Sequence, residues 1–258
     1  MQQFKGLDIL ILLNGNTAIL IEDKTYTKDH SDQLIRYRKV VEKDYPNHLQ
    51  LPIYYKSGSQ SHYRSCKIAG YQPFLREGMI DIMNEGKSMG VRNHIFLDYL
   101  KRLEQIEAGY QSYRWLPIDA WTSLSWQGFY RLLQKELKNG GWGYVANARG
   151  GFQGFWWSKK PENVCYFQLE EKRLCIKIVE RDKLQQRDSR LKASAHLLKQ
   201  PSIEALSFQK PARSKNGQTM TVMVKSDYVQ LNQDGILDVQ ATVEMLKEIE
   251  KHVDLSKK

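Results

Sequence analysis

Two short apolar runs lie near the start of the chain, and a short polar break separates them. Residues 7–13 are apolar except for one acid, and residues 18–21 are apolar throughout. Asn14-Gly15-Asn16 lies between them, and Asn-Gly between apolar, β-branched runs is a strong signal for a β-hairpin. Both faces of this hairpin are apolar, so we expect helices to cover both.

The length of the loop decides which side chains meet across the hairpin. With a three-residue loop, Leu13 pairs with Thr17, and Asp8 then falls directly opposite Glu22. Lys24 shares the face of Glu22, because side chains alternate along a strand. A two-residue loop would shift the register by one position and move Asp8 to the other face. We adopt the three-residue loop, which brings two carboxylates and an amine together.

This constellation suits the metal-dependent cleavage of a phosphodiester. Two adjacent carboxylates repel each other unless a cation lies between them, and oxygen ligands of this kind favour Mg²⁺ or Mn²⁺. Such a metal polarises a phosphate and lowers the pKa of a bound water, which Lys24 would orient or stabilise. The alternative is a strand end with solvated charges, in which Glu22 and Lys24 form an ordinary surface pair.

A helix is expected after the hairpin, and it adds two polar side chains. Its apolar positions have helical spacing, Asp29 or Ser31 is available to cap it, and it ends before Pro46. Gln33 and Tyr37 are four residues apart and therefore share one face of this helix. Beside a metal site they would hold a phosphate or a carboxylate ligand. Alternatively, Tyr37 is a core residue and Gln33 a surface residue.

These segments together resemble the PD-(D/E)xK nuclease superfamily. The resemblance rests on Asp8, on Ile21-Glu22-Asp23-Lys24 and on Gln33-Leu34-Ile35-Arg36-Tyr37. The Gln-x-x-x-Tyr element is similar to that of the RecB-like exonuclease branch. The chain looks particularly like bacterial members that are described only as nuclease-superfamily proteins.

The resemblance implies a role for each of these side chains. Asp8 and Glu22 would bind the metal, and the backbone carbonyl of Asp23 would add a ligand. Lys24 would assist the attacking water. The helix side chains would support the site and contact nucleic acid; they are Gln33 and Tyr37.

The resemblance also implies the fold class of the first part of the chain, and the pattern of the second part predicts a further region. We expect an α/β (α+β) fold with a restriction-endonuclease-like core, in which helices flank a mixed sheet, over residues 1–110. An aromatic-rich, basic α+β region would follow over residues 111–258. Members of this family usually have a helix before the first strand, and only seven residues precede Asp8 here. We therefore expect weak activity or none from the chain as given.

The rest of the chain has further periodic segments. Strands are expected over residues 50–56, 152–157, 164–169, 174–179 and 219–225, and helices over 74–83, 93–106, 121–137, 181–199 and 239–253. All six tryptophans lie between Trp115 and Trp157. Aromatic side chains between Arg and Lys can stack on bases. We favour instead a structural role, in which Trp156, Trp157 and Tyr166 fill the core of a sheet.

Charge is distributed unevenly along the chain. The net charge is +10, and residues 1–110 hold 15 Lys and Arg against 13 Asp and Glu. Residues 111–258 hold 24 against 16, and residues 172–199 alone hold nine against three. A basic face suits a polyanion, with DNA favoured and RNA the alternative. The residues that we expect to contact nucleic acid are Arg149, Lys177, Arg181 and Lys183.

Composition excludes several other classes. No apolar run approaches the ~20 residues of a membrane span, so we expect no membrane partner. Three scattered cysteines predict a reducing cytoplasm and no disulfide framework. The sequence therefore predicts a Mg²⁺- or Mn²⁺-dependent deoxyribonuclease. The alternatives are a non-catalytic nucleic-acid-binding protein that keeps the fold, and a protein-interaction module built on the aromatic second half.

Overall fold

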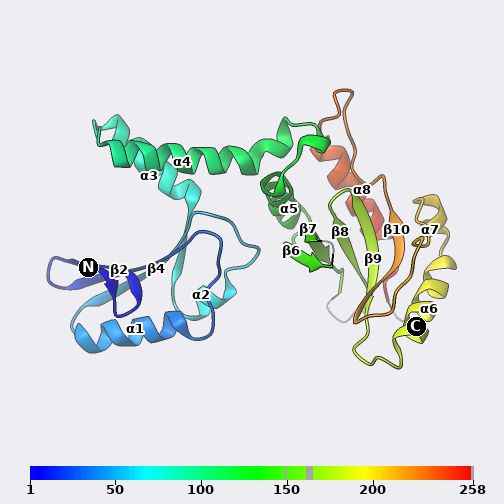
Figure 1. The fold of residues 1–258 in the computed structure, drawn as a ribbon, viewed down its shortest axis with the longest axis horizontal. Helices are drawn as coiled ribbons and strands as arrows, with labels where there is room; N and C mark the ends of the chain where they lie inside the picture. Colours follow the sequence, from blue (N-terminus) through cyan, green and yellow to red (C-terminus); the bar gives the residue numbers. More distant parts are fainter. Residues whose placement is uncertain (149, 161–164, 257–258) are drawn as a thin grey trace. The chain divides into compact units, whose positions relative to one another are not determined.

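The computed structural model describes residues 1–148, 150–160 and 165–256. Contacts between residues divide the chain into two compact units, Met1–Ala108 and Gly109–Lys258, called unit 1 and unit 2 below (Figure 1). The domain boundary expected between residues 110 and 111 stays a prediction.

Unit 1 is built on a mixed sheet with the strand order β1-β2-β3-β4-β5. The first three strands are antiparallel, and β3, β4 and β5 run parallel to one another. The strands are β1 (Gln2–Phe4), β2 (Leu7–Leu13), β3 (Thr17–Lys24), β4 (Leu49–Lys56) and β5 (Gln72–Leu75). The helices are α1 (Gln33–Asp44), α2 (Arg64–Ile68), α3 (Arg76–Ser88) and α4 (His94–Gln111).

The hairpin of β2 and β3 has the predicted register. Leu13 pairs with Thr17, and Ile9 pairs with Ile21, so the loop contains three residues. Two of these residues have positive φ angles, 51° at Asn14 and 70° at Gly15, which is the conformation that Asn and Gly adopt most readily. The same register, continued by one position, places Asp8 opposite Glu22.

One face of this sheet is covered, and the other is covered only in part. Helix α1 packs Val41 against Leu10 and Leu20, and all three are fully buried. On the opposite face Ile11 remains 42% exposed and Leu51 43% exposed. The expectation that helices cover both faces is therefore wrong. Helices α3 and α4 instead bury apolar side chains against each other in a cluster of their own.

Two predicted helix starts are also wrong. Helix α1 begins at Gln33, and neither expected capping residue caps it. The carboxylate of Asp29 accepts a hydrogen bond from the Ser65 hydroxyl, and Ser31 has a φ of 55°, outside the usual geometry of an N-cap. Residues 74 and 75, expected to open a helix, belong to β5 because they pair with β4.

Unit 2 is built on an antiparallel sheet with the order β10-β9-β8-β7-β6. Its strands are β6 (Gly141–Asn147), β7 (Gly150–Trp157), β8 (Cys165–Glu170), β9 (Arg173–Val179) and β10 (Thr219–Lys225). Its helices are α5 (Ser123–Glu136), α6 (Gln186–Leu198), α7 (Pro201–Ala205) and α8 (Val239–His252), with short 3-10 turns at Ser112–Arg114 and Ile118–Ala120. Helix α6 starts five residues later than predicted.

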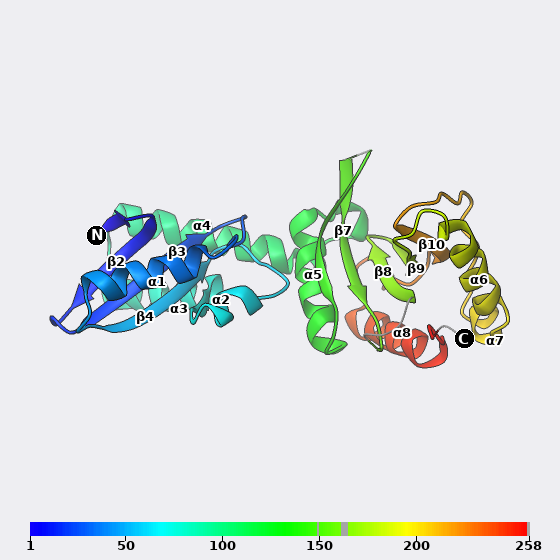
Figure 2. The same ribbon diagram turned by 90° about the horizontal axis from the view of Figure 1, so that it is seen from below.

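The core of unit 2 lies on one face of this sheet. Phe155, Phe167 and Ile176 are fully buried there, together with Phe129 of α5 and Leu246 of α8. Figure 2 shows α8 to one side of β7, β8 and β9, with α6 and α7 beyond β10.

Neighbouring aromatic residues of this sheet lie on opposite faces. Trp157 is 2% exposed and belongs to the core, as predicted. Trp156 and Tyr166 are not core residues: Trp156 is 37% exposed, and Tyr166 precedes the buried Phe167 on its strand. Alternation along a strand turns these two rings away from the core, so the prediction that they fill it is wrong.

Candidate active site

The structure brings together the six residues that were predicted from the sequence of unit 1. Asp8 comes from β2, and α1 supplies Gln33 and Tyr37. The last three residues of β3 complete the set; they are Glu22, Asp23 and Lys24. The β2–β3 register and the packing of α1 on the face of Glu22 position these side chains.

Glu22 is the centre of the site and is 1% exposed. Its Oε1 accepts hydrogen bonds from Lys24 Nζ at 2.5 Å and from Gln33 Nε2 at 2.9 Å. Gln33 Nε2 also donates to the Tyr37 hydroxyl at 3.0 Å. The second carboxylate oxygen of Glu22, Oε2, is buried and has no hydrogen-bond partner. A buried oxygen in this state costs free energy unless a ligand reaches it.

Asp8 is hydrogen-bonded to β3, the strand that carries Glu22. Its Oδ2 accepts a hydrogen bond from the backbone N–H of Asp23 at 2.8 Å, and Oδ1 accepts one from Gln3 at 3.4 Å. These contacts hold the carboxylate of Asp8 beside the end of β3. Sequence reasoning did not identify Gln3, because a short strand before Asp8 was not predicted.

Burial and neighbouring charges shift the pKa values of three groups of the site, and all three are raised. Burial raises the pKa of Glu22, and the charge of Asp8 adds to this, although the hydrogen bond from Lys24 opposes it. Burial and the charge of Asp8 also raise the pKa of Asp23. Burial would lower the pKa of Lys24, but its hydrogen bond and charge interaction with Glu22 outweigh burial and raise it. Lys24 therefore carries its proton at neutral pH.

These residues fit a divalent cation of the Mg²⁺ type. Within the described residues, no group of three His, Cys, Asp or Glu side chains has a metal-binding arrangement. Mg²⁺, however, is commonly held by one or two carboxylates and keeps several waters or phosphate oxygens in its shell. Asp8 and the unpartnered oxygen of Glu22 supply this minimal set of donors.

Lys56 is a neighbour of the site that sequence reasoning missed. It ends β4 and pairs in the parallel register with Lys24. Its side chain is fully buried, and Nζ donates to the carbonyl of Thr27 at 2.5 Å. Burial and the charges of Lys28 and Lys24 lower the pKa of Lys56 to about 8. The available signal was its position at the end of a strand expected beside β3.

The predicted nucleic-acid contacts belong to unit 2. Arg149 lies outside the described residues. Lys177 on β9 is 13% exposed and forms an ion pair with Glu170 at 2.8 Å. Arg181 and Lys183 are exposed in the segment between β9 and α6. Their role in binding stays a prediction.

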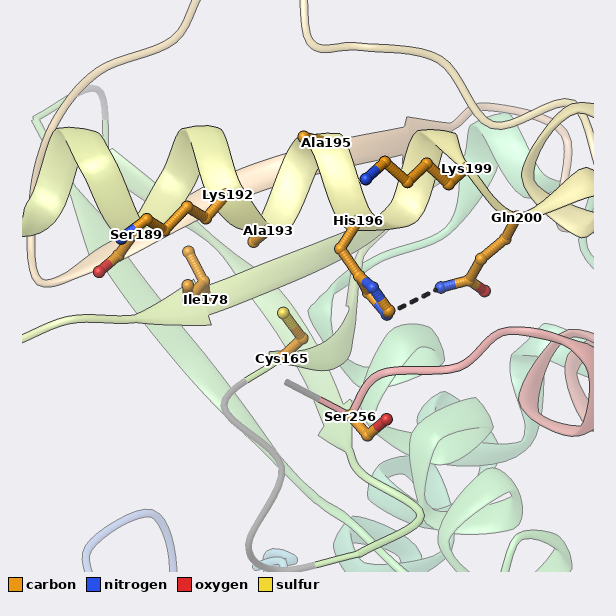
Figure 3. Close-up of a pocket in the computed structure, with 10 residues that line it drawn as sticks. All are labelled: Cys165, Ile178, Ser189, Lys192, Ala193, Ala195, His196, Lys199, Gln200 and Ser256. Atoms are coloured by element: carbon orange, nitrogen blue, oxygen red, sulfur yellow. Dashed lines mark hydrogen bonds between the residues drawn. The ribbon is translucent and has the colours of Figure 1, made fainter. Parts of the chain in front are cut away.

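Unit 2 also contains a cavity of about 550 Å³ beneath α6. Figure 3 shows Lys192 and His196 of α6 above Cys165 and Ile178, with His196 hydrogen-bonded to Gln200. None of the residues predicted for the metal site lines this cavity.

A family comparison assigns the first half of the chain to a known superfamily. The family model of the PD-(D/E)XK nuclease superfamily matches residues 2–131, just over half of the 258 residues. The match includes Asp8, Glu22, Lys24, Gln33 and Tyr37. The chain belongs to the PD-(D/E)XK nuclease superfamily, whose members typically use a divalent metal.

Two further observations complete the comparison. Neither the curated proteins nor the solved structures give a significant match. In the described part of the chain, no helix has the length and apolar character that crossing a bilayer requires.

Proposed function

We propose that this protein is a metal-dependent nuclease that hydrolyses phosphodiester bonds of DNA. Asp8 and Glu22 would hold Mg²⁺ or Mn²⁺, together with the backbone carbonyl of Asp23. A bound ion of this kind polarises the scissile phosphate and lowers the pKa of a coordinated water. Membership of the superfamily supports nuclease-type chemistry and a nucleic acid as the substrate.

One observation carries the proposal: the two oxygens of the Glu22 carboxylate differ in their partners. Lys24 and Gln33 hold Oε1, whereas Oε2 is buried without a partner. The fixed oxygen locks the side chain in one orientation, so the other oxygen stays available to a cation. A carboxylate with a purely structural role would have partners at both oxygens.

Lys24 acts in this proposal as a charged hydrogen-bond donor. Its raised pKa argues against a general base, because a base must lose its proton near neutral pH. A protonated amine beside the metal ligands would orient the attacking water and offset the negative charge that develops on the phosphate.

Gln33 and Tyr37 would act by positioning the Glu22 carboxylate and the substrate. Gln33 links the Glu22 carboxylate to the Tyr37 hydroxyl and keeps one buried oxygen, Oε1, without a partner. This arrangement supports the assignment of the chain to the RecB-like branch, whose Gln-x-x-x-Tyr element it resembles. The Tyr37 hydroxyl accepts the bond from Gln33, so its own O–H is available to donate to a substrate phosphate. We place the protein in the cytoplasm, because its three cysteines form no disulfide within the described residues.

Cleavage of plasmid and linear DNA, and of RNA, with Mg²⁺ and with Mn²⁺ tests the proposal. The wild-type chain should cut at least one substrate, and EDTA should stop it. Glu22→Gln should be inactive, since it removes a ligand charge at nearly constant shape. Glu42→Gln is the matched control, because Glu42 is an exposed acid on α1. If neither metal supports cleavage, the nuclease proposal fails and the chain is a non-catalytic nucleic-acid-binding protein with this fold.

A further inference from the structure

The sheet of unit 2 has a second face that the core does not use. Helices α5, α7 and α8, and Leu197 of α6, bury their apolar side chains in the core cluster on the first face. The alternate residues of the strands point the other way. We call this side the open face. Trp156 is exposed on it, Phe152 and Tyr166 are half-buried, Lys177 is 13% exposed, and Gln168 and Cys175 are buried between them.

Two aromatic rings lie along the open face above glycines. The outer edge of the Trp156 indole lies 3.7 Å from the position that a Cβ at Gly143 would occupy. The Phe152 ring lies 3.3 Å from the corresponding position at Gly154. Because neither glycine has a side chain, each ring can extend over its glycine. Trp156 is 37% exposed in this position.

A third ring continues the surface. Trp156 pairs with Gln168 across the β7–β8 ladder, so Tyr166 is its diagonal neighbour. The Tyr166 hydroxyl donates to Gln168, and Gln168 donates to Glu170. Aromatic rings therefore alternate with amide and carboxylate groups, which match the π-faces and the polar edges of nucleobases.

Positive charge collects at the other end of the open face. Arg173 is 54% exposed beyond its contact with Glu170. It lines a cavity of about 660 Å³ with Lys210 and Arg213, between β9–β10 and the segment that pairs with β10 through Gln209. Lys210 and Arg213 form no ion pair with any residue that the structure describes. We call this cavity the basic groove.

The open face and the basic groove form one continuous path. Arg173 belongs to both, and four strand-to-strand steps of about 4.8 Å separate β7 from the segment at Gln209, about 19 Å in total. Four cations lie on this path: Lys177, Arg173, Lys210 and Arg213. Two acids offset them in part, Glu170, which pairs with Lys177 and Arg173, and Asp227, which lines the groove and pairs with Lys225. The path is therefore positively charged and suits an extended polyanion.

We propose that the open face and the basic groove bind single-stranded nucleic acid. Its bases would stack on Trp156, Tyr166 and Phe152, and its phosphates would contact Arg173, Lys210 and Arg213. Stacking on flat aromatic rings needs unpaired bases, because the bases of a duplex already stack on one another. The proposal rests on unit 2 alone and does not require cleavage by unit 1.

Binding of labelled oligonucleotides to the full-length chain in EDTA tests this proposal. Fluorescence anisotropy would compare single-stranded DNA, single-stranded RNA and the matched duplex, with the single strands expected to bind more tightly. Trp156→Ala should weaken single-strand binding about five- to hundred-fold, which corresponds to the loss of one base stack. Trp156→Phe should retain most of the affinity. The matched control is Trp115→Ala, because Trp115 is 50% exposed and lies before the first strand of the sheet.

A charge series tests the groove separately. Lys210→Gln combined with Arg213→Gln should lower the slope of log affinity against log salt by about 1.4, from two lost phosphate contacts. Lys247→Gln combined with Lys251→Gln on α8 should leave that slope unchanged.

Three results would overturn the proposal. Unchanged affinity in Trp156→Ala would show that this ring binds no base. Equal affinity for duplex and single strand, with equal sensitivity to Trp156→Ala, would exclude stacking on unpaired bases. A change of sedimentation coefficient in Trp156→Ala, without a change of affinity, would assign the open face to contact with a second copy of the chain. If the wild-type chain cleaved no substrate with either metal but still bound single strands through Trp156, the nuclease proposal would fail and this proposal would stand.

Discussion

Lys24 and Glu22 lie two residues apart on β3, and the Lys24 amine holds one oxygen of the Glu22 carboxylate at 2.5 Å. The contact has two effects. It keeps Lys24 protonated although the side chain is largely buried, and it engages only one oxygen of Glu22, whose second carboxylate oxygen is buried without a partner. The proposed roles of both residues follow from this one contact.

Metal should stabilise the folded chain. Mg²⁺ or Mn²⁺ that binds the folded state alone raises the free energy of unfolding by mass action. Each 1 kcal/mol should raise the melting temperature by about 2–4 °C for a chain of this size. Calorimetry should detect this rise in the wild type and its loss in the Asp8→Asn, Glu22→Gln double variant. A shift of equal size in the double variant would place the metal elsewhere.

Lys24→Ala should abolish cleavage and leave binding intact. Removal of one preorganised donor to a developing charge typically lowers kcat by about 100- to 1000-fold. DNA affinity and metal affinity should change little, because the amine is neither a ligand nor a major phosphate contact. Single-turnover cleavage and anisotropy binding measure the two effects separately. Lys39→Ala, at an exposed position of α1, is the control.

The buried amine of Lys56 should give stability a distinct pH dependence. Its pKa is lowered to about 8 from an ordinary 10.5, so between these values the folded state binds fewer protons than the unfolded chain. The free energy of unfolding should therefore rise as the pH increases from about 8 to 10.5. Below pH 8 the Lys56 amine is protonated in both states, so this stabilising contribution is absent. Across the window the rise is about 3 kcal/mol. Urea denaturation at both ends should show it in the wild type and not in Lys56→Met, with the exposed Lys39→Met as control.

Gly128→Ala should destabilise unit 2. A Cβ at this position of α5 would overlap the backbone carbonyl oxygen of Tyr110. Alanine gains about 1 kcal/mol of helix propensity over glycine, but overpacking against backbone costs about 1–3 kcal/mol or more, so the clash should dominate. Thermal denaturation measures the difference. Gly217→Ala should be nearly neutral, since its nearest neighbour would lie 3.7 Å away.

The exposed cations after β9 should contribute to nucleic-acid affinity through charge alone. Arg181→Glu combined with Lys183→Glu should weaken binding to all sequences alike and reduce the salt slope, by roughly 0.9 per lost contact on duplex DNA. Titration at several salt concentrations measures the slope. An unchanged slope would exclude both residues from the binding surface.

Part of the site could be predicted from the sequence because local signals fix it. An Asn-Gly turn between two apolar runs predicts the β2–β3 hairpin. It leaves two loop lengths open, and the three-residue loop, chosen because it puts Asp8 opposite Glu22, is the one observed. Helical spacing then places Gln33 and Tyr37 on one face. Each of these inferences needs only residues that are close along the chain.

The rest could not be predicted because it depends on distant partners. Lys56 reaches the site through parallel pairing with β3, across more than thirty residues. Asp29, one of the two expected capping residues of α1, instead accepts a hydrogen bond from Ser65, thirty-six residues further along the chain. Trp156 and Trp157 are chemically alike, and only the pairing of β7 determines which of the two is buried.

All six tryptophans lie within unit 2, and unit 1 contains none. Tryptophan fluorescence therefore reports on unit 2 and not on unit 1. A denaturation curve followed by this emission describes unit 2, whereas circular dichroism averages over both units. Where the two curves separate, the difference measures the unfolding of the half that carries Asp8 and Glu22, without any dye or engineered probe.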